Sequence, residues 1–288
     1  MSEISAGVVM KLRKMSGQGM MDCKKALQEA NGDIEEAMVI LRKKGLATLE
    51  KRAGRETSEG KVICTISKDG KAVAMATLCC ETDFVANSND FSAAADLLQG
   101  FLLGCPEDQG VENVLDTVVN GRKFSDVLTE AVSKTGEKIE LADYERIQLD
   151  GAGLFGTYVH FNGKIGAVVQ IATSDAEMTK SEELKQLASD IAMHVTALKP
   201  LAINKDQIAA DIIEREKAIA AEQVRNKPAN IVDKIVEGKM RKFFAENCLV
   251  DQPFVKDDNK TVAQMVKETT DKLGGKAEIK KIIRFEIG

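Results

Sequence analysis

The sequence predicts an α+β protein with an N-terminal module of three helices, a duplicated α+β core with antiparallel sheets, and an inserted antiparallel helical hairpin. The first observation is a pair of hairpin-turn dipeptides, Asp69-Gly70 and Asn162-Gly163, each followed by an apolar strand and then a helix. The second is the helical spacing of apolar residues over residues 4–45 and again over about 204–248.

The N-terminal module is predicted to hold three short helices within residues 4–45. Gly17-Gln18-Gly19 separates the first two, and Asp33 is placed to cap the third, with a glutamate three positions further on. Gly45 is expected to end the third helix. Residues 51–60 are charged and lack apolar periodicity, so we predict a linker there.

The core is predicted to be an internal duplication. At an offset of 93 residues, residues 68–71 match 161–164, and the closing strands at 146–149 and 284–287 match at an offset of 138. The difference of 45 residues predicts an insertion in the second copy, a helical hairpin that turns at Asn226-Lys227-Pro228. The predicted divisions are 1–54 for the module and linker, 55–150 for the first core subdomain, and 151–288 for the second with its insertion.

Composition excludes several classes of function. The 288 residues carry a net charge of −5, which disfavours general binding to phosphate backbones, so we expect no direct nucleic-acid contact. No apolar run approaches the ~20 residues that span a bilayer, so no membrane contact is expected. Met1-Ser2-Glu3-Ile4 lacks the features of a signal or transit peptide, which predicts a cytoplasmic protein. The six cysteines, including adjacent Cys79-Cys80, are expected to be buried or half-buried thiols.

Motifs for nucleotide, metal and cofactor binding are missing from the sequence. It has no Gly-rich phosphate loop, so we predict that the chain binds no nucleotide itself. Its two histidines, His160 and His194, are too few for a His-rich metal site, and no Cys-x-x-Cys pair completes a zinc site. We therefore expect no metal and no cofactor. His194 is expected to pack against the sheet, and His160, near a hairpin turn, is either a surface contact or solvated.

The segment 80–87 is the most informative feature, because it places the acid-aromatic pair Asp83-Phe84 directly after an apolar strand. At the offset of 93, this pair faces Ala176 and Glu177, so the scaffold is repeated and the pair is not. A short loop between rigid elements can present one side chain to a partner at low entropic cost. The alternative is that Phe84 is a core residue of its own subdomain.

Adjacent Met20 and Met21 begin the second helix and cannot both face the core, since neighbouring residues differ by about 100° around a helix axis. At least one is expected to be exposed, where a soft apolar side chain beside basic residues suits a protein partner. A loosely packed methionine under the preceding glycine turn is the alternative.

Several long motifs, in order along the whole chain, resemble those of translation elongation factor Ts. They are residues 12–13, 17–27, 29–33, 81–86, 191–195 and 284–286. The resemblance implies a ubiquitin-associated-like three-helix module joined to a duplicated core. It implies a guanine nucleotide exchange factor for elongation factor Tu, which acts without covalent catalysis. The sequence leaves a homo-oligomer or a two-to-two complex open.

The resemblance also implies the residues that contact the partner. The loop that enters the GTPase near its magnesium site is Thr82, Asp83, Phe84 and Val85, with Phe84 as a wedge. Arg13, Met20 and Met21 match residues that dock the N-terminal module on the GTPase domain, and His160 falls where the core offers a further contact.

Two other classes of function stay open on the residues alone. The three-helix module could serve an adaptor that binds a helix or a tail, although this leaves Asp83-Phe84 unexplained. A thiol enzyme could use Cys79 or Cys80, but both sit at the end of an apolar strand, where a thiol is expected to be buried.

Overall fold

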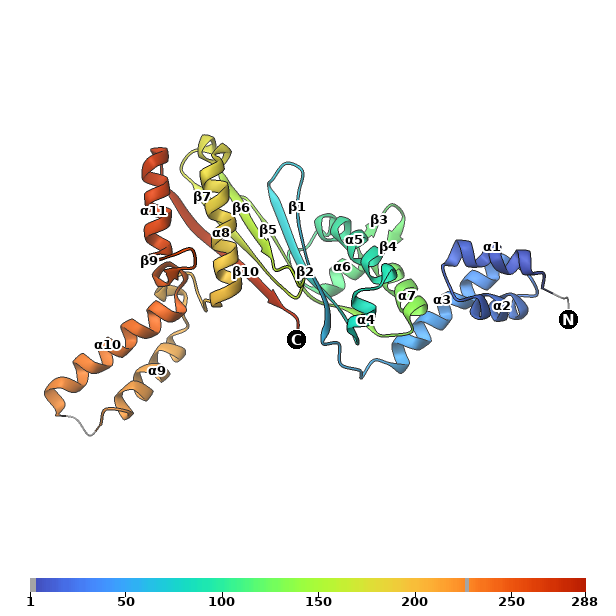
Figure 1. Cartoon of the computed structure of the whole chain (residues 1–288), viewed down its shortest axis with the longest axis horizontal. Coiled ribbons are helices and arrows are strands. Elements are labelled where there is room, and N and C mark those ends of the chain that lie inside the picture. Colours follow the sequence, from blue (N-terminus) through green and yellow to red (C-terminus); the bar gives the residue numbers. More distant parts are fainter. Residues whose placement is uncertain (1–3, 226–227) are drawn as a thin grey trace.

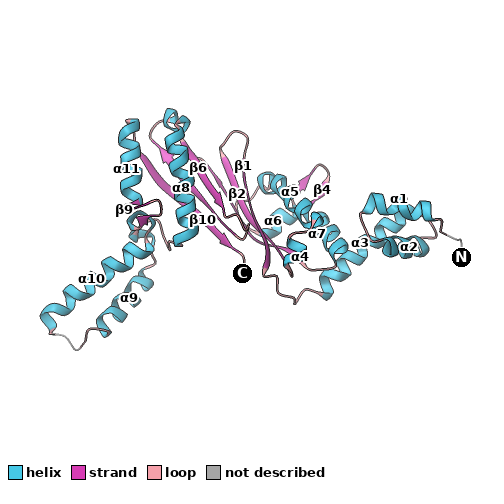
Figure 2. Cartoon of the chain, in the orientation of Figure 1, coloured by secondary structure: helices cyan, strands magenta, loops and turns pink. Residues whose placement is uncertain are grey.

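The protein is a mixed α+β molecule with helices at both ends and antiparallel sheets between them, seen in a computed structural model that describes residues 4–225 and 228–288 (Figures 1 and 2). The helices are α1 (Ala6–Ser16), α2 (Met20–Glu29), α3 (Ile34–Lys51), α4 (Asp83–Ala86), α5 (Asn89–Gly104), α6 (Val111–Asp116), α7 (Phe124–Thr135), α8 (Glu182–Leu198), α9 (Ala210–Glu222), α10 (Ala229–Asn247) and α11 (Val262–Leu273). The strands are β1 (Glu59–Ile66), β2 (Ala72–Cys80), β3 (Val118–Val119), β4 (Arg122–Lys123), β5 (Ile139–Gln148), β6 (Gly153–Val159), β7 (Ile165–Thr173), β8 (Pro253–Phe254), β9 (Asp257–Thr261) and β10 (Ala277–Glu286). The 3₁₀ turns are η1 (Ala176–Lys180), η2 (Lys205–Gln207) and η3 (Leu249–Asp251).

The three predicted N-terminal helices are confirmed as α1, α2 and α3, which pack around a small apolar cluster. Ser5 caps α1 through the N–H of Val8, and Asp33 caps α3 through the N–H of Glu36 at 2.9 Å. The buried residues of this cluster are Val9, Leu12, Cys23, Ala26, Leu27, Ala30, Ala37 and Leu41.

The predicted end of the third helix at Gly45 is wrong, because α3 continues to Lys51. Gly45 is buried where α3 crosses α7, and a Cβ atom at this position would lie only 2.6 Å from the carbonyl oxygen of Thr129. The glycine therefore permits a close approach between two helices and does not act as a stop. Since β1 begins at Glu59, the connection to the core is shorter than predicted.

Both predicted hairpins are confirmed. Gly70 has a φ of +69° and Gly163 a φ of +72°, the left-handed conformation that their turn dipeptides favour. The strand orders of the two three-stranded sheets are β1-β2-β5 and β6-β7-β10, and every neighbouring pair is antiparallel. The predicted closing strands at 146–149 and 284–287 fall at the ends of the longer strands β5 and β10, which stop one residue earlier, at Gln148 and Glu286.

The two sheets face each other, and helices cover their outer faces. Strand β2 is buried on both sides: Val73, Met75 and Cys79 belong to the cluster between the sheets, and alternate residues belong to the cluster under α5 and α7. Strand β7 is similar, since Val168 faces the first sheet while Ala167 and Val169 pack with residues of α8 and α11. This alternation follows from the two-residue period of a strand.

The predicted helical hairpin is present as α9 and α10, which project together from the second sheet half (Figure 1). Their antiparallel contact includes a hydrogen bond from Lys239 to Gln223. Of the predicted turn, Asn226 and Lys227 lie outside the described residues, and Pro228 is the N-cap of α10. The base of this arm packs into a separate apolar cluster of Ala202, Ile208, Cys248, Ile212, Ile213, Phe243 and Phe244.

His194 is buried in α8, and its side chain contacts the segment that follows the arm. The N–H of Val255 donates to its Nδ1 at 3.1 Å, so the proton lies on Nε2, which faces the Oε1 of Gln252 at 2.9 Å. Gln252 is itself buried, and its Nε2 donates to the carbonyl oxygens of Leu198 and Glu246. This network joins α8, the arm and β8, and it requires a neutral imidazole.

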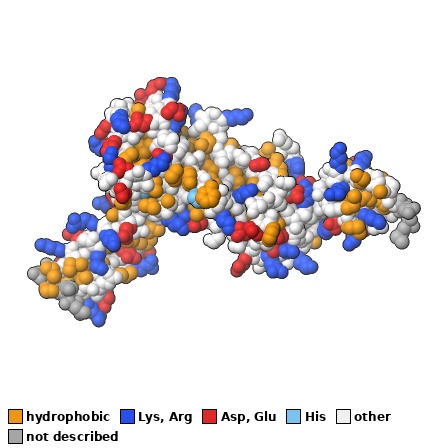
Figure 3. Space-filling model, in the orientation of Figure 1, with side chains coloured by type: hydrophobic (Ala, Val, Ile, Leu, Met, Phe, Trp, Pro, Cys, Tyr) orange, Lys and Arg blue, Asp and Glu red, His pale blue; other side chains and the backbone are white. Residues whose placement is uncertain are grey.

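The visible surface carries acidic and basic side chains that alternate with small apolar areas (Figure 3). Among residues 4–225 and 228–288, the structure contains no helix long and apolar enough to cross a membrane.

The outer part of the arm is expected to be dispensable for folding, whereas its base is not. Replacing residues 214–242 with a short flexible loop keeps the base cluster around Phe243 and Cys248 and removes mainly contacts between α9 and α10. The shortened chain should unfold in one cooperative transition with a similar Tm in a thermal melt. A non-cooperative melt would show that the outer arm supports the core.

The buried His194 network predicts a stability that falls as pH falls. Burial lowers the pKa of His194 below its ordinary value of 6.5, against the opposing effect of the Gln252 hydrogen bond. Below pH 6.5 the unfolded state therefore binds more protons than the folded state, and the free energy of unfolding should decrease by up to about 1.4 kcal/mol per pH unit.

Chemical denaturation between pH 5 and 7.5 measures this dependence. The variant His194→Gln should lose the slope, and the control His160→Gln, which alters the half-exposed second histidine, should keep it. An unchanged slope in His194→Gln would contradict the assignment.

Candidate functional site

The segment predicted as a loop after β2 is one turn of helix, α4, and Phe84 projects from it into solvent. Thr82 caps the turn, because its hydroxyl oxygen accepts from the N–H of Val85 at 3.3 Å. Val85 and Ala86 are buried in the cluster under α5 and α7, whereas the Phe84 residue is 83% exposed. The alternative that Phe84 is a core residue is therefore wrong.

The residue before the turn is held by two neighbouring segments. Nη1 of Arg52, the residue that follows α3, lies 2.8 Å from both carboxylate oxygens of Glu81. The backbone N–H of Lys138 donates to the same carboxylate at 2.7 Å. Burial raises the pKa of Glu81, but the hydrogen bonds from Lys138 and Arg52 and the charge of Arg52 outweigh it, so the pKa lies below its usual range.

The cap of the turn is held in the same way from the other side. The Glu137 carboxylate accepts from the N–H of Thr82 at 3.1 Å and from its hydroxyl at 2.9 Å. Glu137 follows Gly136, which ends α7 in the left-handed conformation. The segment that carries Phe84 is thus bound to the ends of both α3 and α7.

The second half has a comparable turn without the aromatic. The 3₁₀ turn η1 is capped by Asp175, whose carboxylate accepts from the N–H of Glu177 at 3.0 Å. Met178 of η1 is buried, as is Val85 of α4. The residue before Met178 is the charged Glu177, in the position where α4 has Phe84.

The N-terminal candidates lie on a different part of the molecule. Arg13 of α1 and both Met20 and Met21 of α2 are exposed. These two helices sit at the N-terminal end of α3, while α4 lies on the core near the other end (Figure 1). The structure therefore does not gather these residues and Phe84 into one cluster.

His160 forms a third location, in the turn between β6 and β7. Its Nδ1 lies 3.2 Å from the Tyr158 hydroxyl, and its ring centroid lies 4.3 Å from that of Phe161. Phe161 is 92% exposed, which makes it a second solvent-facing aromatic beside a predicted site residue. Its sequence context, next to a turn, gave no signal for this exposure.

The thiols near the site are not poised for nucleophilic chemistry. Cys79 and Cys80 are buried, as predicted, and burial raises the pKa of Cys79 to about 11 and that of Cys80 to about 12. The Cys80 thiol also donates to the carbonyl oxygen of Thr82 at 3.2 Å. Because a thiolate is the reactive form, both groups are inert at neutral pH.

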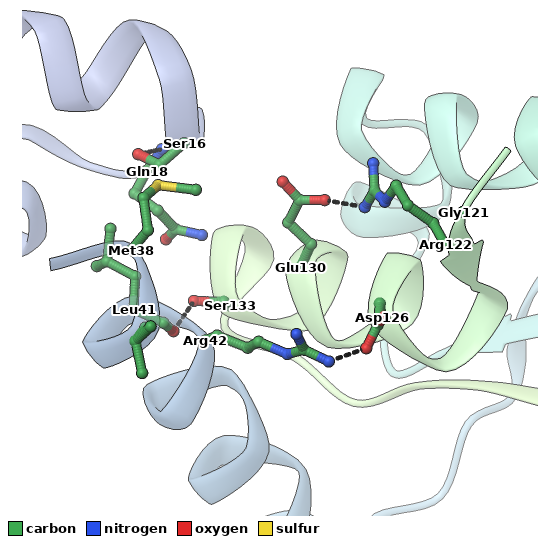
Figure 4. Close-up of a pocket in the computed structure, with 11 residues that line it drawn as sticks. Ser16, Gln18, Met38, Leu41, Arg42, Gly121, Arg122, Asp126, Glu130 and Ser133 are labelled. Carbon is green, nitrogen blue, oxygen red and sulfur yellow. Dashed lines mark hydrogen bonds and ion pairs between the residues drawn. The ribbon is translucent and has the colours of Figure 1, made fainter. Parts of the chain in front are cut away.

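A cavity of about 510 Å³ opens where α3 meets α7 and the β3–β4 turn (Figure 4). Arg42 pairs with Asp126, and Arg122 pairs with Glu130 at 2.6 Å. The Ser133 hydroxyl donates to the carbonyl oxygen of Leu41 at 3.3 Å. No predicted site residue lines this cavity. The Arg42–Asp126 pair and the Ser133–Leu41 hydrogen bond join α3 to the core, whereas the Arg122–Glu130 pair joins β4 to α7.

Comparison with known proteins agrees with the sequence motifs. A family profile described as "Elongation factor TS" matches residues 81–288. Elongation factor Ts of a Nitratiruptor species is 41% identical over 287 residues, covering 99% of this chain and 93% of its own. That of Aquifex aeolicus is 40% identical over 294 residues, covering 99% and 98%, and that of Desulfovibrio desulfuricans is 39% identical over 291 residues, covering 100% and 99%. The chain belongs to the elongation factor Ts family.

Proposed function

We propose that the chain accelerates nucleotide exchange by inserting the Phe84 side chain of α4 into its partner. Members of the elongation factor Ts family are nucleotide exchange factors for elongation factor Tu in translation elongation, so the chain is an exchange factor and not an enzyme. The observation that supports this role for Phe84 is its 83% exposure on a turn whose next two residues are buried. A rigidly mounted aromatic is the kind of side chain that dominates the energy of a protein interface.

The target we propose is the magnesium site of the GTPase. Mg²⁺ demands near-octahedral geometry and bridges nucleotide phosphates, so a small displacement of its protein ligands weakens GDP binding strongly. Asp83 is exposed next to Phe84 and would position the turn, with Thr82 as its cap. Val85 is buried and would act as the anchor of the turn more than as a contact.

Linkage fixes the direction of the effect. If the bound chain lowers the affinity of the GTPase for GDP by some factor, then bound GDP lowers the affinity of the GTPase for the chain by the same factor. The chain therefore accelerates exchange in both directions, and the abundance of GTP and capture by tRNA decide the outcome.

We assign the other contacts to separate surfaces. Exposed Arg13, Met20 and Met21 would dock the N-terminal helices on the GTPase domain, and His160 would contribute a further contact from the core. The three locations lie on different elements, which suits a partner held at several points around Phe84. Translation elongation takes place in the bacterial cytoplasm, which is where the protein acts.

We also infer that the core is a duplication and that the chain divides at residues 1–54, 55–150 and 151–288. The support is the repeated strand order, together with β7 starting and ending 93 residues after β2. Both α11 and β10 start and end 138 residues after α7 and β5. The arm of α9 and α10 accounts for the extra 45 residues of the second half, and the N-terminal bundle is the ubiquitin-associated-like module.

Release of a fluorescent GDP from purified elongation factor Tu, with and without the chain, tests this function.

The variant Phe84→Ala should slow GDP release more than tenfold, because an interface aromatic of this kind contributes about 2 kcal/mol or more. Its free energy of unfolding should change by less than about 0.5 kcal/mol, since the side chain is exposed. The control Leu201→Ala, which truncates another exposed apolar residue, should keep the rate. A folded Phe84→Ala variant with full activity would refute the role.

Asp83→Ala should give a weaker version of the same loss, because the acid positions the turn and adds little contact area. The same assay measures it, and a loss larger than that of Phe84→Ala would assign the main role to the carboxylate.

The isolated chain should bind no GDP, because it has no phosphate-cradling loop. Titration calorimetry of GDP into the chain should give no saturable heat, whereas the same titration into nucleotide-free elongation factor Tu should. A micromolar Kd for the isolated chain would contradict the prediction.

A further inference from the structure

We propose that Arg52 and Glu137 are positioning residues for nucleotide exchange, which hold the α4 turn in the orientation that Phe84 requires and join it to the N-terminal helices. The proposal rests on the proposed role of Phe84 and deepens it. Neither residue carried a signal in the sequence, because each lies at a helix end far from α4 along the chain.

The Arg52 side acts through Glu81, the residue next to the cap. Arg52 donates to both of its carboxylate oxygens at 2.8 Å, and the N–H of Lys138 donates at 2.7 Å. The Glu81 side chain is only 13% exposed, so water competes little for these hydrogen bonds. Glu81, at the start of the turn, is therefore held by two segments, the end of α3 and the residues that follow α7.

The Glu137 side acts through the Thr82 hydroxyl. A hydroxyl has one hydrogen, and Glu137 accepts it at 2.9 Å, which leaves the oxygen lone pairs for the N–H of Val85. Glu137 also accepts from the backbone N–H of Thr82 at 3.1 Å. The carboxylate thus sets the hydroxyl direction that caps α4.

The two helices that supply these groups are packed on each other. Gly45 of α3 lies against Thr129 of α7, and the Ser133 hydroxyl donates to the Leu41 carbonyl oxygen (Figure 4). An 18-residue helix such as α3 is about 27 Å long, so it connects the exposed methionines of the N-terminal helices to the turn as one rigid spacer. Docking of those helices would therefore set where Phe84 enters the partner.

The expected effect is local. The Arg52 side chain is about one-third exposed, so water can reach the Glu81 carboxylate once Arg52 is removed, and the N–H of Lys138 still donates to it. Loss of the pair frees the turn to sample other orientations, and ordering them again on binding lowers the efficiency of Phe84.

We call the contacts of Arg52 with Glu81 and of Glu137 with Thr82 the clamp. Hydrogen exchange of the free full-length chain tests the clamp without the partner. In the native chain, the amides of residues 85–88 donate hydrogen bonds within the turn. In Arg52→Ala and Glu137→Ala these amides should exchange about tenfold faster, while the exchange rates of other amides stay unchanged. The control Lys267→Ala, which removes an exposed ion pair in α11, should have no effect on these amides. Unchanged exchange at 85–88 in both variants would refute the clamp.

GDP release from elongation factor Tu tests the functional part. At saturating concentration of the chain, Arg52→Ala and Glu137→Ala should each lower the maximal rate of GDP release about fivefold. The double variant Arg52→Ala/Glu81→Gln should be no slower than the slower of its two single variants, Arg52→Ala and Glu81→Gln. The conservative variants Arg52→Lys and Glu137→Gln, which keep a donor or an acceptor, should recover most of the rate and serve where an alanine variant melts early.

The outcomes separate the two proposals. Variants with a mobile turn and an undiminished rate would refute positioning, and multiplying effects in the double variant would refute the pairing of Arg52 with Glu81. A native chain that fails to accelerate GDP release would refute the proposed function, while hydrogen exchange would still decide whether the clamp exists.

Discussion

The fold depends on the burial of β2 on both of its faces. Val73 and Met75 pack between the two sheets, while Leu78 packs under the helices of the first half. Each such side chain contributes roughly 1.5–3 kcal/mol on burial, whereas an exposed ion pair contributes about 0–1 kcal/mol. Neither sheet could cover its inner face alone, so the second half is the support of the first.

This support reaches the α4 turn directly. The N–H of Val62 donates to the carbonyl oxygen of Gly163 at 2.7 Å, and Lys164 pairs with Glu59 at 2.7 Å. The turn of the β6–β7 hairpin is therefore bound to β1. Strand β1 is paired with β2 up to Cys80, two residues before the cap of α4. The α4 turn therefore follows directly on a strand that is paired along its whole length, and such mounting lowers the entropic cost of binding through Phe84.

The sequence predicted what depends on local chemistry and missed what depends on contacts between distant segments. Asp69-Gly70 and Asn162-Gly163 favour tight turns in which the glycine is left-handed, so both hairpins were predictable. Gly45 was misread as a stop because only the fold reveals that α7 approaches it. The same limit applies to the candidate site: the sequence around Phe84 pointed to it, but only the fold shows that Arg52 and Glu137 contact the turn that carries it.

The two halves of the core have comparable turns at the same point of their sheets. Both place a capped turn after the central strand, and both bury an apolar residue of that turn, Val85 or Met178. The two residues before it differ in kind, Asp83-Phe84 in one turn and Ala176-Glu177 in the other. The exposed Phe84 is flanked by the charged Asp83, whereas the second turn has the charged Glu177 in the position of Phe84. In each turn the buried residue packs on the core, so the exposed residues before it can differ without disturbing that packing. Under the proposed function, Asp83-Phe84 is the pair that meets the partner.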